Sequence, residues 1–457
     1  MSAELPESPA GSNPDNPGET AENEAPATPP STPNNPGLRA WLSRHRVLTD
    51  VLTMLGGTGG AQLITLLGYL VLARIYTDSD FGVLSIIVSI GSIGAVLAAG
   101  RYDPAIMLPD TDRDAKQVVR LSVTINVIFS VIFLAGSLGA TFALSRVWPQ
   151  VAPLLIFAAL YVTVTSLSSI WTFWLNRLGE YRQISANRLF SAIAQVGLQI
   201  GAWLVGLGGA VGLIGGRIFG VLAATITLGY RARGSRTDVD KTPGARRRAL
   251  RRYRKMPLLN GPSAIADAVR INGINLMIAA IFSTAMLGQF SFAWLIVQAP
   301  VALINGAVSQ VYFRELTNTP RGRLRAMAAS VTKRGALAGL VPFAALAALS
   351  PWLIPLIFGA RWEMAGLIVT ILCPWLYVNL VTSPVSNIFV VTETQQVSLG
   401  FSLMFAAVPL GLLGLAGWLG WGILMTCGVL SAAMTVMLVV FIGLALHVAA
   451  RFDTAAA

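Results

Sequence analysis

Long apolar stretches separated by short polar segments occupy the chain from Thr49 onward. Each has about 20 or more residues with few charges, the length that an α-helix needs to cross roughly 30 Å of hydrocarbon. The pattern therefore predicts an all-α polytopic membrane protein with about twelve transmembrane helices. Their expected ranges are 49–73, 81–100, 117–145, 151–175, 185–206, 208–230, 258–282, 287–313, 328–350, 364–391, 396–416 and 421–447.

Two polar segments divide this pattern. Residues 1–37 contain six acidic residues, no Lys or Arg and many Pro, Asn, Ser and Thr, which predicts a disordered cytoplasmic tail. Residues 231–255 contain eleven Lys or Arg against two Asp and predict a basic cytoplasmic linker. The expected domains between and after them are an N-terminal six-helix bundle, 38–230, and a C-terminal six-helix bundle, 256–457.

Charge distribution sets the expected orientation. Lys and Arg near membrane spans stay in the cytoplasm, and an N-terminus-in topology places almost all of them there. Both termini are then cytoplasmic, and only Arg217 and Arg270 are assigned to the interior of spans. The net charge of +12 belongs to these juxtamembrane loops, so no nucleic-acid partner is expected.

The two halves of the chain resemble each other. Ile75-Tyr76-Thr77, Gly82 and Ser85 match Ile281-Phe282-Ser283, Gly288 and Ser291 at a constant offset of 206 residues. Because each half has six spans, both halves begin on the same side of the membrane. This predicts parallel repeats related by an axis along the membrane normal, as in transporters that rock two bundles about a central site.

Four stretches of the sequence are distinctive. The most specific are RYDPAIMLP from Arg101 and VSQVYFRE from Val308, and LARIYTDSDFGVLSI (72–86) and WTFWLNRLGEYRQIS (171–185) support them. These stretches resemble bacterial polysaccharide-unit flippases of the multidrug, oligosaccharidyl-lipid and polysaccharide exporter superfamily. The resemblance covers nearly everything after Thr49. It implies a V-shaped exporter fold in the bacterial cytoplasmic membrane. It also implies flipping of polyprenyl-pyrophosphate-linked oligosaccharides from the inner to the outer leaflet.

Such a cargo carries two phosphates, so a carrier needs cations in its interior. Arg270 is expected near the membrane midplane and Arg217 is a second candidate, because intramembrane charges are expensive and usually functional. Asp267 lies on the same helical face as Arg270 and either holds it or merely neutralises it. Arg101 is either the mouth of the pathway or part of a cytoplasmic turn. Gln62, beside a cluster of glycines, marks either a bend or a packing surface in the first span.

Three functional classes are open at this point. A flippase of lipid-linked glycan for O-antigen, capsule or exopolysaccharide biosynthesis is favoured, with membrane lipid and a polysaccharide polymerase and chain-length machinery as possible partners. A multidrug antiporter or a lipid II flippase of the same superfamily is the alternative. An enzyme is not expected, because the outer loops are short and no Walker-type nucleotide loop is present. No metal-ligand spacing occurs and no cofactor is expected.

Overall fold

The computed structural model describes residues 36–233, 245–254, 256–298, 301, 322–385, 388–392 and 394–454, and these are almost entirely helical. The first half contains α1 (Pro36–Ile75), α2 (Asp78–Ala98), α3 (Asp112–Leu144), α4 (Leu155–Arg177), α5 (Tyr181–Leu204) and α6 (Gly209–Arg233). The second half contains α8 (Gly261–Ile281), a helix over 284–298, α10 (Leu324–Phe358), α11 (Glu363–Val385), α13 (Gln395–Leu419) and α14 (Ile423–Thr454). Two shorter helices are α7 (Ala245–Arg252) and α12 (Ile388–Val391).

Eleven of the twelve predicted spans coincide with long helices. The twelfth, 287–313, is helical over 284–298, and most of its remainder lies outside the described residues. The all-helical polytopic fold class is therefore confirmed. Ten of the described helices are long and apolar enough to cross a membrane by length and composition. α5 is not among the ten, because Asn187, Arg188, Gln195 and Gln199 lower its hydropathy along most of its length. The predicted tail lies mostly outside the described residues, and the predicted basic linker includes α7.

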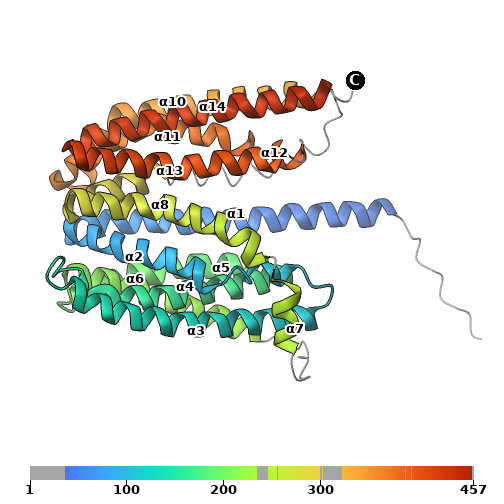
Figure 1. Ribbon diagram of the computed structural model, residues 1–457, viewed down its shortest axis with the longest axis horizontal. Coiled ribbons are helices and arrows are strands. Elements are labelled where there is room, and N and C mark those ends of the chain that lie inside the picture. The colour runs from blue at the N-terminus through green and yellow to red at the C-terminus, as the bar shows by residue number, and fades with distance from the viewer. Residues whose placement is uncertain are drawn as a thin grey trace, which may run out of the picture. The chain divides into compact units, whose positions relative to one another are not determined.

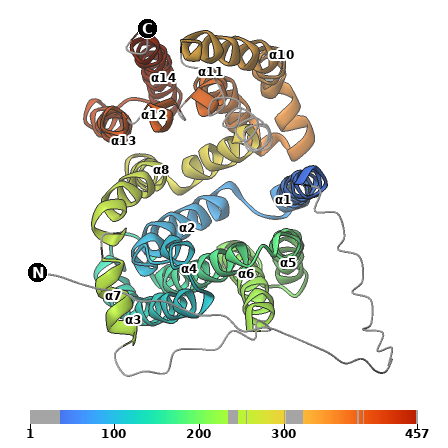
Figure 2. The same cartoon turned by 90° about the vertical axis from the view of Figure 1, so that its right-hand side faces the viewer.

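The helices from residue 48 onward form one unit with two groups (Figures 1 and 2). In the first group α5 packs on α6, and α4 packs on α2, α3 and α6. In the second, α11 packs on α10 and α14, and α13 packs on α14. α8 contacts both α2 and α13, so it connects the two groups.

α2 begins earlier than the apolar pattern indicates, because a capping box starts it at Asp78. The Thr77 hydroxyl accepts a hydrogen bond from the backbone N–H of Asp80, and the Asp80 carboxylate accepts one from the backbone N–H of Thr77. Such a pair satisfies two helix-terminal donors that would otherwise lack partners. The polar sequence before the span therefore belongs to the helix.

Some glycines of α6 and α1 lie at close helix–helix contacts. A Cβ added to Gly216 would lie 2.5 Å from the backbone nitrogen of Gln199, and one added to Gly220 would lie 2.5 Å from the backbone of Gln195. α6 therefore lies directly on the α5 backbone, as small residues allow. α1 is continuous through its glycines and contacts α5 in the same way, since a Cβ on Gly57 would meet Ser185. The glycine cluster of the first predicted span therefore serves helix packing and does not bend the helix.

A close crossing joins the two halves at the start of α2 and of the helix over 284–298. A Cβ on Gly82 would lie 1.8 Å from the carbonyl oxygen of Thr284, and a Cβ on Gly288 would lie 1.8 Å from that of Asp78. The repeat offset of 206 residues relates Gly82 to Gly288 and Asp78 to Thr284, so the two contacts are equivalent positions of the repeat. The repeated glycines of the sequence thus let the two helices cross backbone to backbone.

Candidate functional site

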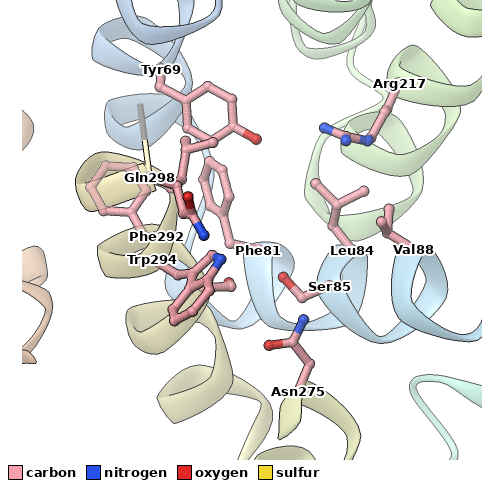
Figure 3. A pocket seen from close by; sticks show the side chains of 12 residues that line it. Tyr69, Phe81, Leu84, Ser85, Val88, Arg217, Asn275, Phe292, Trp294 and Gln298 are labelled. Atoms are coloured by element: carbon pink, nitrogen blue, oxygen red, sulfur yellow. The ribbon is translucent and has the colours of Figure 1, made fainter. Parts of the chain in front are cut away.

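A cavity of about 230 Å³ lies between the two halves (Figure 3). α1, α2 and α6 line it from the first half, and α8 and the helix over 284–298 line it from the second. Among the described residues, its walls combine aromatic, amide and hydroxyl side chains with a single cation. The lining residues are Tyr69, Phe81, Leu84, Ser85, Val88, Arg217, Asn275, Ser291, Phe292, Trp294, Leu295 and Gln298.

Arg217 supplies the cation of this cavity. It lies on α6 beside Gly216, and its guanidinium interacts with the phenolic hydroxyls of Tyr69 and Tyr161. In Figure 3 the guanidinium and the Tyr69 hydroxyl point toward each other. Its Nε is buried and has no hydrogen-bond partner among the described residues. Neutral phenols leave the positive charge uncompensated, so the group is suited to an anion.

Arg270 lines a smaller adjoining cavity of about 30 Å³. Asn275 and Trp294 line both cavities, so the two arginines are connected through shared walls. The Arg270 guanidinium lies 4.9 Å from the centre of the Phe405 ring, which provides a cation–π contact. Asp267 is near but loosely held, with 3.7 Å between its Oδ1 and the Nη2 of Arg270. Its side chain is 60% exposed against 20% for Arg270, so Asp267 does not need the arginine for its own solvation.

Arg101 lies elsewhere, in the segment between α2 and α3, and lines neither cavity. Gly100 and Arg101 both have φ near +54°, a left-handed pair that ends the helix and reverses the chain. Asp103 is 5% exposed, and its Oδ2 accepts a hydrogen bond from Ser169 at 2.7 Å. Burial raises the pKa of Asp103, although the Ser169 hydrogen bond and the Arg101 charge act in the opposite direction. Arg101 is therefore part of an ordered turn with a buried carboxylate.

Gln62 is partly buried on α1 and lines neither cavity. It shares a helix face with Tyr69, seven residues later, at the spacing of two helical turns. Gln62 thus lies roughly 10 Å from Tyr69 along the α1 axis and not at the wall of the Arg217 cavity.

Sequence reasoning missed two kinds of residue. Arg188 falls inside the predicted span 185–206 but was counted with the cytoplasmic residues, and the structure places its guanidinium against Thr58 of α1. Tyr69, Asn275 and Trp294 were not singled out, because isolated aromatic and amide residues in a span carry no distinctive pattern. Only their position beside the arginines in the folded protein identifies them as cavity residues.

The ends of the helices predicted to face outward are joined across the halves. The Trp362 indole donates to the Ala73 carbonyl at 2.9 Å, and Arg361 donates to the Tyr76 carbonyl at 3.0 Å. Gln289 donates to the Arg361 carbonyl at 2.7 Å and to the Asp78 carboxylate at 3.2 Å. Residues near three helix ends that the predicted topology places on one side therefore share one hydrogen-bonded network, and the Trp362 ring of this network stacks on Phe292 of the cavity wall with 4.0 Å between ring centres.

The fold is similar to those of a solved multidrug transporter and a solved lipid II flippase. An inward-facing multidrug resistance MATE family transporter of the MOP superfamily has 15% identity and a TM-score of 0.67, covering 89% of this chain and 96% of that chain. The lipid II flippase MurJ, in an inward closed conformation, has 13% identity and a TM-score of 0.65, covering 88% and 90%. A MOP superfamily transporter from Pyrococcus furiosus, whose binding pocket is described as having reverse polarity, has 14% identity and a TM-score of 0.54, covering 88% and 96%.

The family assignment comes from the sequence. A family model described as "Polysaccharide biosynthesis protein" matches residues 71–366, more than half of the chain. The chain therefore belongs to this polysaccharide biosynthesis family, which confirms the resemblance seen in the sequence. No curated protein matches the chain.

Proposed function

We propose that this protein flips a polyprenyl-pyrophosphate-linked oligosaccharide from the inner to the outer leaflet of the bacterial cytoplasmic membrane. The translocated unit would serve biosynthesis of a cell-surface polysaccharide such as O-antigen, capsule or exopolysaccharide, with both termini of the protein in the cytoplasm. A polymerase and chain-length machinery on the far side would consume the product. Membership of the polysaccharide biosynthesis family supports the cargo class, and the exporter fold supports translocation.

The observation that carries the proposal is the charge of the central cavity. Among the described residues that line it, Arg217 is the single charged group and no carboxylate is present. A guanidinium bonds two phosphate oxygens at once, which suits a pyrophosphate. Tyr69, Trp294 and Gln298 add aromatic faces and polar groups of the kind that bind sugars by stacking and hydrogen bonding.

The joined outer ends support alternating access. In this proposal the network around Gln289, Arg361 and Trp362 is the closed outer gate of the pathway. A cargo would then enter from the inner leaflet and leave after this network opens. The two groups of helices are the bodies that would move, as in transporters built from repeats.

A small-molecule antiporter is the second candidate, because multidrug transporters share this fold. An antiporter for organic cations needs acidic groups in the cavity, and the described lining of the Arg217 cavity has none. A lipid II flippase would also need an anion site, so cavity charge does not separate it from the proposed function. Family membership favours a polysaccharide precursor.

The test replaces the two arginines in cells that depend on this protein for surface polysaccharide. Arg217→Ala and Arg270→Ala should abolish export and cause the lipid-linked precursor to accumulate in the inner leaflet, with normal protein levels in the membrane. Arg217→Lys and Arg270→Lys should keep partial function, because Lys supplies the charge without the planar fork. Precursor is measured by extraction and mass spectrometry.

A structural role for the Arg270 pair gives the opposite pattern. If Arg270 only neutralises Asp267, the double variant Arg270→Ala/Asp267→Asn should recover both abundance and export. The loose 3.7 Å contact and the exposed Asp267 side chain lead us to expect no recovery. Recovery of export in the double variant would refute a phosphate-binding role for Arg270. Drug sensitivity without precursor accumulation would favour the antiporter.

A further inference from the structure

Arg188 is the cation that the proposed transport mechanism leaves unused. It lies on α5, partly buried, and its Nη1 donates a hydrogen bond to the hydroxyl of Thr58 on α1. Among the described residues, no carboxylate lies within ion-pair distance of it. A partly buried arginine held only by a neutral hydroxyl retains its charge for another group.

α1 and α5 run side by side in the same direction at this place. Added Cβ atoms on Gly57, Gly60 and Gly68 would meet Ser185, Leu189 and Val196, respectively. The separation of 11 residues is the same on both helices, which fixes their register. Arg188 therefore lies level with Thr58, while Tyr69 and the Arg217 cavity lie further along the same groove.

A polar face of α1 connects the two levels. Thr58, Gln62, Thr65 and Tyr69 follow at steps of four, three and four residues, which places them on one face of the helix. Tyr69 already lines the Arg217 cavity. The distance from Thr58 to Tyr69 along the axis is roughly 16 Å at 1.5 Å per residue. Each of the three earlier residues is partly exposed, so a charged headgroup could be hydrogen-bonded along this face.

α6 confirms the vertical order of the arginines. Gly216 packs on Gln199 and Gly220 packs on Gln195, so α6 runs antiparallel to α5 and Arg217 lies level with Leu198 of α5. Arg188 is about three helical turns nearer the start of α5. In the predicted topology that start is cytoplasmic. Arg188 is thus between the inner leaflet and the cavity.

We propose that Arg188, with Thr58, forms an entry site for the pyrophosphate of the lipid-linked cargo, before that group reaches Arg217. This inference rests on the proposed function. The occupant is a lipid pyrophosphate and not a bulk anionic phospholipid, because the polar face leads inward to a second arginine. The alternative is a structural one, in which Arg188 only holds α5 against α1.

The test measures binding to the purified full-length protein in detergent, with farnesyl pyrophosphate as the probe. Arg188→Gln should weaken binding about tenfold, the loss expected for one charge-assisted contact. The matched control is Arg182→Gln, an exposed arginine six residues earlier on the same helix, which should leave binding unchanged. Phosphatidylglycerol is added as a competitor and should not displace the probe at equal concentration.

A swapped variant separates binding from packing. Thr58→Arg/Arg188→Thr keeps one cation in the same groove but on the other helix, and it should recover most of the lost binding. Two results would overturn the entry site, provided that Arg217→Ala still abolishes binding. One is unchanged probe binding in Arg188→Gln. The other is a loss of binding that accompanies an equal fall in thermal stability and that the swapped variant does not recover. Displacement of the probe by phosphatidylglycerol would overturn the choice of cargo. Absence of any pyrophosphate binding to the unaltered protein would overturn the proposed function and the entry site together.

Discussion

Asp103 shows how one residue responds to its surroundings. It follows the left-handed Gly100-Arg101 pair, is almost fully buried and has one carboxylate oxygen without a hydrogen-bond partner among the described residues. Burial raises its pKa, so the folded protein takes up a proton at a higher pH than the unfolded chain does. The folded state must therefore gain stability as the pH falls through the raised pKa.

We expect Asp103→Asn to remove this dependence. The neutral amide keeps a partner for Ser169 and needs no charge solvation, so the melting temperature at neutral pH should equal or exceed that of the unaltered protein. Melting is followed by tryptophan fluorescence in detergent from about pH 8 down to about pH 4, near the ordinary pKa of an aspartate. Asp110→Asn, an exposed carboxylate in the same segment, is the control and should keep the rise on acidification. A rise of the same size in Asp103→Asn would contradict the assignment.

At the residue scale the sequence identified two of the buried arginines but not the side chains that surround them. Arg217 and Arg270 were recognisable because charges inside apolar spans are rare. Their environments were not, because Tyr69 and Asn275 come from other helices and carry no pattern of their own. Arg188 was overlooked because the boundary of a polar span is difficult to place from hydropathy alone.

At the scale of the helix, α6 packs on α5 through the glycines on one of its faces, and a glycine on another face has no close neighbour. Gly216→Ala places a methyl group against the backbone of Gln199 and should lower the melting temperature, with overpacking costing about 1–3 kcal/mol. Gly215→Ala is the matched control. The nearest atom to its added Cβ lies 4.0 Å away, so it should be neutral or stabilise the helix by up to about 1 kcal/mol. Equal effects of the two variants would show that the close approach is not present.

At the scale of the whole molecule, the joined outer ends predict that a covalent link there stops transport. Ser79 and Thr284 belong to opposite halves, and their hydroxyl oxygens are 3.0 Å apart. The double variant Ser79→Cys/Thr284→Cys should form a disulfide on mild oxidation and lose export, and reduction should restore it. The native Cys373 and Cys427 are buried and should not compete.

A disulfide within one half serves as the control. Thr141 donates to the carbonyl of Ala152 at 3.0 Å inside the first group of helices. Thr141→Cys/Ala152→Cys, oxidised in the same way, should leave export intact because it does not join the two moving groups. Full export by the Ser79–Thr284 disulfide, once its formation is complete, would exclude movement of the halves at this crossing.

The sequence by itself determined the class of protein, the number of long helices and the family. These follow from local properties, since an apolar stretch of the right length forms a helix in a membrane wherever it occurs in the chain. The constant offset of 206 residues also identified Gly82 and Gly288 before their role was known. Only the tertiary structure decided that each meets the other half's backbone, at Thr284 and Asp78.

Which side chains meet depends on how each helix is rotated about its axis and on which distant helix lies beside it. Hydropathy does not report these quantities, because lipid-facing and protein-facing positions are both apolar in a membrane. The tertiary structure therefore decided that Arg217 interacts with Tyr69 and Tyr161 and lines a cavity between the halves, while Arg101 lies in a separate turn. It also placed Arg188 against Thr58, a contact between residues 130 positions apart.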